Sequence, residues 1–135
     1  MSRLTEADLI WNRACGDDKL RDLPGDRALA DLLIAHGLAM NGGVLHAVEC
    51  MTAEQLSDAD SGYRYFGLDG IASLLTRAQR ILELGEDLEA REDQLDAEYV
   101  ELIPTDTELG QRFEARFKTH RSDFAPLRAI DGDGG

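Results

Sequence analysis

The stretch from Asp69 to Leu84 constrains the fold most, because its apolar residues recur with the period of an α-helix. They lie at relative positions i, i+3, i+4, i+7, i+10 and i+11, namely Ile71, Leu74, Leu75, Ala78, Ile81 and Leu82. This spacing places them on one stripe of a helix. Asp69 is predicted to be the N-cap, and Gly85 is predicted to end the helix in the left-handed conformation. An isolated amphipathic helix is not stable in water, so other segments must cover the stripe.

Further helices are predicted on both sides of this stretch. They cover residues 5–14, 26–40, 44–51, 53–56, 63–66, 86–103 and 105–120, and a last turn contains Phe124. The apolar stripe of the second helix is expected to be Leu29, Leu32, Leu33, His36 and Met40. The predicted caps are Thr5, Asp26, Thr52, Thr105 and Ser122. Pro24-Gly25 and residues 57–62 are predicted to be a turn and a polar loop.

No segment shows sustained alternation of apolar and polar residues, so little or no β-sheet is expected. We therefore predict an all-α fold, an orthogonal bundle of about six helices with short connections. The length of 135 residues suits one domain, expected over residues 1–130. The glycine-rich segment 131–135 is expected to be a disordered tail.

The net charge limits the classes of partner. The chain has 14 Lys and Arg residues against 27 Asp and Glu residues, which gives −13. This charge disfavours direct binding to nucleic acid or to an anionic membrane and favours a basic protein partner. Cys15 and Cys50 form no CxxC pair, and the sequence shows no signal peptide or membrane-spanning apolar run. A cytoplasmic location is therefore expected.

Acidic residues concentrate between Glu86 and Glu108, where ten acids accompany a single cation, Arg91. Residues three and four apart are neighbours on a helix, so these carboxylates form a row of negative charge resembling nucleic acid phosphates. Such a surface could equally serve only to keep the protein soluble, or reflect life in high salt. The candidate partner-binding residues are Glu86, Asp87, Glu89, Glu92, Asp93, Asp96, Glu98 and Glu101.

Catalytic and metal sites find less support in the sequence. His46 and Cys50 are four residues apart, so they share a helix face and could contact one metal, with Glu49 or His36 as a third ligand. Core or boundary histidines are the preferred interpretation, because no recognisable set of four ligands occurs. No nucleophile motif is present, and Asn41-Gly42-Gly43 is interpreted as a structural turn rather than a phosphate-binding loop. We therefore expect no catalytic residues, no metal and no cofactor.

Three stretches carry a family resemblance: Asn41-Gly42-Gly43 with the apolar helix after it, Phe66-Gly67 before the central helix, and Leu95 to Tyr99. Together they resemble a family of acidic, all-helical bacterial domains typified by a DNA-mimic protein. The matching positions are Asn41, Gly42, Gly43, Gly67, Leu95, Asp96 and Tyr99, and the resemblance covers residues 26–117. The sequence departs from the family after the glycines, where residues 44–48 read VLHAV instead of an aromatic and glutamine-containing run. The resemblance implies a dimer whose negative surface occupies the DNA-binding face of a transcription factor.

These observations leave three hypotheses. The first is a non-enzymatic DNA mimic that binds the basic surface of a nucleic-acid-binding protein such as a transcription regulator. The second is an immunity or antitoxin protein that neutralises a basic nuclease toxin. The third is a small metal-binding protein or enzyme that uses His46, Cys50 and Glu49.

Overall fold

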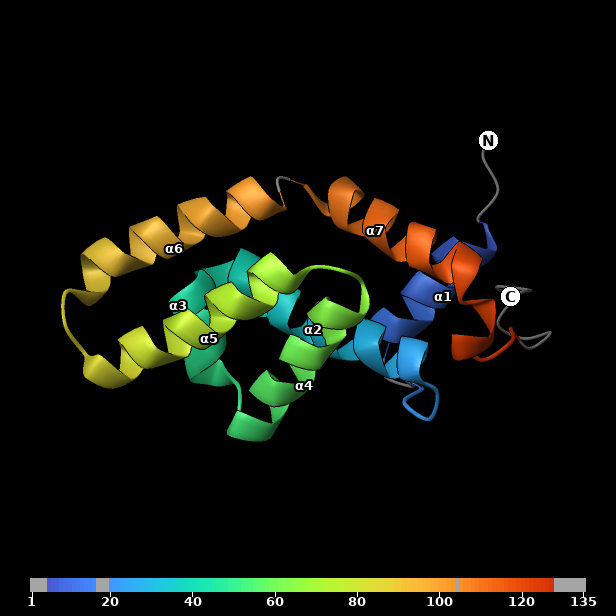
Figure 1. Cartoon of the computed structure of the whole chain (residues 1–135), viewed down its shortest axis with the longest axis horizontal. Helices are drawn as coiled ribbons and strands as arrows, with labels where there is room; N and C mark the ends of the chain where they lie inside the picture. The colour runs from blue at the N-terminus through green and yellow to red at the C-terminus, as the bar shows by residue number, and fades with distance from the viewer. Residues whose placement is uncertain (1–4, 17–19, 104, 128–135) are drawn as a thin grey trace.

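The computed structural model describes residues 5–16, 20–103 and 105–127, and these residues form an all-helical structure (Figure 1). The α-helices are α1 (Glu6–Cys15), α2 (Pro24–Gly42), α3 (Val44–Cys50), α4 (Ala53–Tyr65), α5 (Asp69–Leu84), α6 (Leu88–Leu102) and α7 (Asp106–Thr119). A short 3₁₀ helix, η1 (Arg121–Asp123), follows α7. No strand occurs within the described ranges, and the predicted all-α bundle is confirmed. The predicted tail, 131–135, lies outside the described residues.

The helices form an elongated bundle in which α2 and α4 pack together near the centre (Figure 1). α5 packs on α3 and α4, and α6 lies along α5 and α3. α6 and α7 follow one another along the same long edge of the molecule, with α1 beside α7 at the far end from α6 (Figure 1). α6 therefore has one side against the bundle and the other toward solvent.

The predicted stripe of α5 lies in the core. Ile71, Leu74, Leu75 and Ala78 are buried, and Ile81 and Leu82, near the end of the helix, are half-buried. Gly85 ends α5 with φ 69° and ψ 16°, the predicted left-handed conformation. The predicted N-cap is wrong, because Leu68 occupies that position and Asp69 is the first residue of the helix. Asp69 faces the positive end of the helix dipole there instead of capping a backbone N–H.

The prediction of a polar loop over residues 57–62 is wrong, because these residues lie within α4 and are helical. Leu56, Ala59 and Tyr63 recur at i, i+3 and i+7 and are all buried. Gly62, which indicates a turn locally, allows α4 to approach α2: a β-carbon there would lie 2.5 Å from the carbonyl oxygen of Ala28. Burial of one face against α2 thus outweighs the turn preference of the two aspartates and two serines of this segment.

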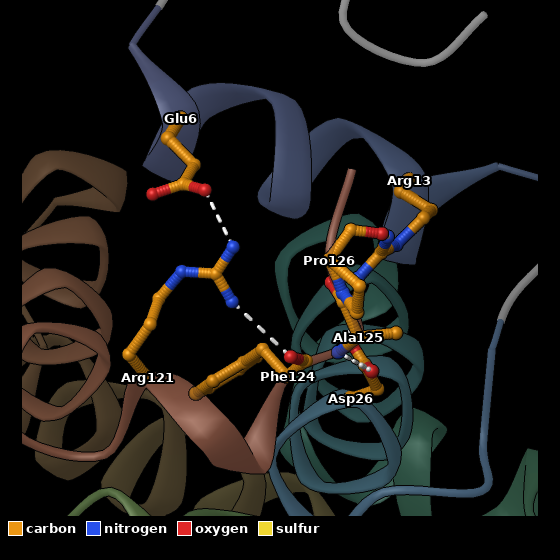
Figure 2. A network of polar contacts seen from close by, with 7 residues as sticks. All are labelled: Glu6, Arg13, Asp26, Arg121, Phe124, Ala125 and Pro126. Atoms are coloured by element: carbon orange, nitrogen blue, oxygen red, sulfur yellow. Dashed lines mark hydrogen bonds and ion pairs between the residues drawn. The ribbon is translucent and has the colours of Figure 1, made fainter. Parts of the chain in front are cut away.

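The start of α2 also differs from the prediction. Pro24 is the first residue of α2 and Leu23 its N-cap, so Pro24-Gly25 is not a turn and Asp26 is not the cap. Asp26 is buried, and its carboxylate accepts hydrogen bonds from Arg13 at 2.9 Å and from the backbone N–H of Ala125 at 2.7 Å (Figure 2). Asp26 therefore joins α1, α2 and the segment after η1.

The segment around η1 completes the core at this end. Phe124 is buried, and a β-carbon at Gly25 would lie 2.6 Å from its ring, so only glycine leaves room for the ring there. Arg121 donates hydrogen bonds to the carbonyl of Phe124 and to Glu6 of α1 (Figure 2). A last turn is therefore present, but it starts and ends earlier than predicted: His120 and not Ser122 is its N-cap, and Phe124 is its C-cap and lies outside it.

The structure confirms the three remaining predicted caps. Thr5 and Thr52 each form a reciprocal capping box, with Asp8 and Gln55 respectively. The hydroxyl of Thr105 accepts a hydrogen bond from the backbone N–H of Glu108 at 3.2 Å, as predicted for the start of α7. In the described part of the chain, no helix is long and apolar enough to cross a bilayer.

The close approach at Gly62 yields a stability prediction. Gly62→Ala places a methyl group against the backbone of α2, so we expect a loss of about 1–3 kcal/mol in the free energy of unfolding. Gly110→Ala in α7 is the control, because no atom lies within 4 Å of its added β-carbon, and helix propensity should then raise stability by up to about 1 kcal/mol. Urea denaturation followed by circular dichroism measures both. Equal effects of the two substitutions would contradict the close packing of α2 and α4.

Candidate interaction surface

Most of the predicted acidic residues lie on the solvent side of α6 or just before it. Leu95 and Tyr99 are the buried residues of this helix. Glu86, Asp87, Glu89, Asp93 and Glu101 are exposed, and Glu92 is half-buried. Among the described residues, the side chains of these six acids form no hydrogen bond and no ion pair. We call this set the α6 acidic surface; its negative charge is not neutralised by contacts within the described residues.

Two further predicted residues have structural contacts instead. Asp96 accepts a hydrogen bond from the backbone N–H of Val44 at 2.8 Å, so it caps the first turn of α3. Glu98 forms a bidentate pair with Arg77 of α5, with distances of 2.5 and 3.2 Å. Asp96 and Glu98 therefore fix α6 to its neighbours on both sides.

The predicted turn Asn41-Gly42-Gly43 lies where α2 gives way to α3. α2 continues through Gly42, and Gly43 is the single connecting residue, with φ 95°. This value favours glycine, and a β-carbon at Gly43 would also lie 2.9 Å from a carboxylate oxygen of Asp96. A β-carbon at Gly42 would lie 2.4 Å from the His46 ring. The glycines thus let α3 start directly after α2, with Asp96 over its first turn.

Tyr99 belongs to a chain of polar groups that joins four helices; three of its members are buried, and the chain ends at the exposed Asp106. Its hydroxyl lies 2.8 Å from His36 Nδ1 of α2 and 2.8 Å from the Tyr63 hydroxyl of α4. His36 Nε2 lies 2.8 Å from a carboxylate oxygen of Asp106, at the start of α7. A neutral His36 with its proton on Nε2 satisfies every contact, because Tyr63 then donates to Tyr99, Tyr99 to Nδ1, and Nε2 to Asp106. His36 is thus a core histidine with a defined role, as the preferred interpretation stated.

Burial perturbs the tyrosines of this region. Burial raises the pKa of Tyr63 well above its ordinary value of 10, and the neighbouring Tyr99 adds to the shift. Burial likewise raises the pKa of Tyr99. Burial and the hydrogen bond that Tyr65 donates to Asp123 raise the pKa of Tyr65 to about 12.

Of the residues in the metal hypothesis, the structure places His46 and Cys50 together. The Cys50 sulfur lies 3.7 Å from the nearest ring nitrogens of His46, as their spacing predicted. His36 is held by Tyr99 and Asp106. Within the described ranges, no group of three or more His, Cys, Asp or Glu side chains could hold a metal ion.

Positive charge is sparse near the α6 acidic surface. Arg77, Arg80 and Arg91 are the only cations of α5 and α6, and Arg77 is paired with Glu98. The other described cations belong to α1, α2, α4, α7, η1 and the loop before α2, and four of them, Arg13, Arg21, Arg64 and Arg121, pair with acids. Residues 85–102, which form α6 and the α5–α6 loop at one end of the long axis, contain eight acids and one cation, so this end carries a local excess of negative charge (Figure 1).

Sequence reasoning missed two features of this region. It assigned Met40 to a buried stripe, but 54% of this side chain is exposed, because α6 does not cover this position of α2. It also did not identify Tyr99 and Asp106 as the partners of His36. The i to i+4 spacing of Leu95 and Tyr99 did signal that Tyr99 faces inward, but nothing in the sequence signalled its partner.

Asp96 and Asp93 should differ in their effect on stability although both are acids of α6. Asp96→Ala removes the cap of α3, so we expect it to lower the free energy of unfolding by about 0.5–2 kcal/mol. Asp93→Ala, at an exposed position without a polar partner, should change it by no more than about 0.5 kcal/mol. Chemical denaturation of the two variants tests this, and similar losses would argue against the capping role.

The tyrosines make stability depend on pH in the alkaline range. Their pKa values are raised in the folded state, so their contribution to stability is complete below pH 10 and declines as the pH rises above 10. Ultraviolet phenolate absorbance of the native protein should therefore stay low near pH 10, whereas the urea-unfolded chain titrates there. A tyrosine that ionises near pH 10 while the helical circular dichroism persists would contradict this burial.

Comparison with known proteins identifies the family. A family model described as DMP19-like protein matches residues 21–130, which include the turn, the polar chain and the α6 acidic surface. No curated protein and no solved structure matches the chain. The match confirms the resemblance seen in the sequence: the chain belongs to the DMP19-like family, that of DNA mimic protein 19.

Proposed function

We propose that this protein is a non-enzymatic interaction protein that acts as a DNA mimic. The α6 acidic surface binds the basic surface of a nucleic-acid-binding protein, such as a transcription regulator, and so competes with nucleic acid. The protein works in the cytoplasm and needs no cofactor.

The observation that carries this proposal is the set of six acids on and before α6 without polar partners. Like charges this close destabilise a helix by a few tenths of a kcal/mol per pair. A single helical stripe contains Glu89 and Asp93, about 6 Å apart along the axis at 1.5 Å per residue. Carboxylates at such spacing offer a basic protein repeated sites for charge-assisted hydrogen bonds, as phosphates do. Membership in the DMP19-like family supports the same function.

Charge reversal on α6 tests the proposal. Glu89→Lys combined with Asp93→Lys should weaken binding to a basic partner at least roughly tenfold, because two attractive contacts become repulsive. Asp96 is left unchanged, since its removal would disturb α3. The matched control is Asp22→Lys with Glu54→Lys, which changes the net charge equally. Glu54 and Glu89 both lie in the first turn of their helices.

Wild type and both variants serve as bait for native bacterial lysate at low and high salt. We expect wild type and control to retain basic nucleic-acid-binding proteins at low salt and release them at high salt, while the α6 variant retains none. Equal retention by the two double variants would show that the α6 acidic surface is not the binding site. Retention of one dedicated nuclease in place of a regulator would favour the immunity hypothesis.

A further inference from the structure

An apolar hollow lies beside the α6 acidic surface and is not explained by charge mimicry. It has a volume of about 230 Å³ and lies between the end of α2, the start of α3 and α6. Met40 and Val100 line it from opposite sides, and 54% and 52% of these side chains are exposed. Single exposed apolar side chains are ordinary on protein surfaces, but here two large ones line the same concave site.

The hollow is continuous with the acids of α6. Val100 follows Glu89, Asp93 and Asp96 at i+11, i+7 and i+4, so these four residues form one stripe of the helix. Among the described residues that line the hollow, Asp96 is the one that carries a charge. A partner that fills it must therefore present an apolar side chain next to cations.

A second hollow, of about 370 Å³, lies further along α2. Gly37, one turn before Met40, is exposed and lines it together with Leu33, and Asp106 is the charged residue in its lining. From Leu33 to Met40 the surface of α2 that borders the two hollows measures about 10 Å, or two helical turns. This surface is helical and offers no free backbone groups for strand pairing, so the partner segment must satisfy its own backbone. An amphipathic helix does so and places apolar side chains at intervals of about 6 Å.

We propose that this hollow receives an apolar side chain of a basic amphipathic helix, while Glu89 and Asp93 pair with cations of the same helix. This inference rests on the proposed function and names the part of the partner that is bound. DNA-binding proteins commonly insert such a helix into the major groove. The hollow would thus add affinity that salt does not screen to binding that is otherwise electrostatic.

The charge beside the hollow argues against a second copy of this chain as the occupant. A two-fold contact through this surface would bring Asp93 and Asp96 of one copy near the same residues of the other. With a net charge of −13 on each chain, nothing in the hollow offsets that repulsion. A cationic helix is attracted rather than repelled by the same carboxylates.

Two synthetic helical peptides test the proposal. One carries arginines and lysines beside a row of leucines, and the other has serines in place of the leucines. The protein variant is Met40→Gln with Val100→Thr. Leu84→Gln is the matched control, because Leu84 is 67% exposed at the end of α5 and does not line either hollow. Circular dichroism confirms the fold, and Met40→Gln alone provides a milder variant.

Fluorescence anisotropy over a series of salt concentrations gives the affinities. We expect the double variant to bind the leucine peptide on the order of tenfold more weakly at every salt concentration, with an unchanged salt slope. Binding of the serine peptide should be the same for wild type, variant and control. Wild-type affinity of the double variant for the leucine peptide would overturn the inference but leave the proposed function intact.

Two other outcomes are distinguishable. If wild type binds neither peptide at low salt, both the inference and the proposed function fail. If sedimentation shows a wild-type dimer that the Met40→Gln, Val100→Thr variant loses, the hollow joins two copies of this chain, and the inference fails alone.

Discussion

The hydrogen bond from the backbone N–H of Val44 to Asp96 is the contact on which the arrangement of α6 depends. Only Leu95 and Tyr99 of α6 are buried, with Ile103 just after its end. The hydrophobic contact between α6 and the bundle is therefore limited to a narrow strip. Asp96 adds a directional contact to the start of α3, and Gly43 makes room for its carboxylate. Without this contact, α6 would be held by Leu95, by Tyr99 and by the pair between Glu98 and Arg77, and its contact with the start of α3 would be lost.

Tyr99 explains why the same helix can tolerate so much charge. Its hydroxyl joins α6 to His36 of α2 and Tyr63 of α4, and His36 in turn reaches Asp106 at the start of α7. The buried members of this network, His36, Tyr63 and Tyr99, find their partners when α2, α4 and α6 pack in this arrangement, which makes the network a strong determinant of specific packing. One side of α6 therefore carries the contacts that fix the helix, and the other side carries carboxylates without partners among the described residues.

The positions on which the resemblance to the family was based thereby gain a physical interpretation. Asn41-Gly42-Gly43 and the stretch from Leu95 to Tyr99 are far apart in the sequence, yet they meet where α2, α3 and α6 come together. Both are structural elements that position the α6 acidic surface. The second stretch contains Asp96 and Glu98, which were predicted to bind a partner but contact Val44 and Arg77 instead.

Local pattern was sufficient to predict the all-α class, the stripe of α5, the left-handed Gly85 and the caps at Thr5, Thr52 and Thr105, because each depends on residues a few positions apart. It failed where contacts with residues far away in the sequence determine the local structure. Residues 57–62 are helical because Tyr63 and Gly62 pack on α2, and Asp26 is buried because Arg13 and Ala125 bind it. For the same reason the sequence revealed the cluster of acids but could not separate Asp96 and Glu98, which have partners, from the six that have none.

Carboxylate footprinting tests the central claim most directly. The protein is labelled with a carbodiimide and an amine, free and in the complex captured from lysate at low salt, and mass spectrometry locates the modified acids. We expect Glu86, Glu89 and Asp93 to react in the free protein and to be protected in the complex. Asp96 should react slowly in both, and Asp22 and Glu54 equally in both. Unchanged labelling of Glu86, Glu89 and Asp93 on binding would contradict the assignment of the α6 acidic surface as the binding site.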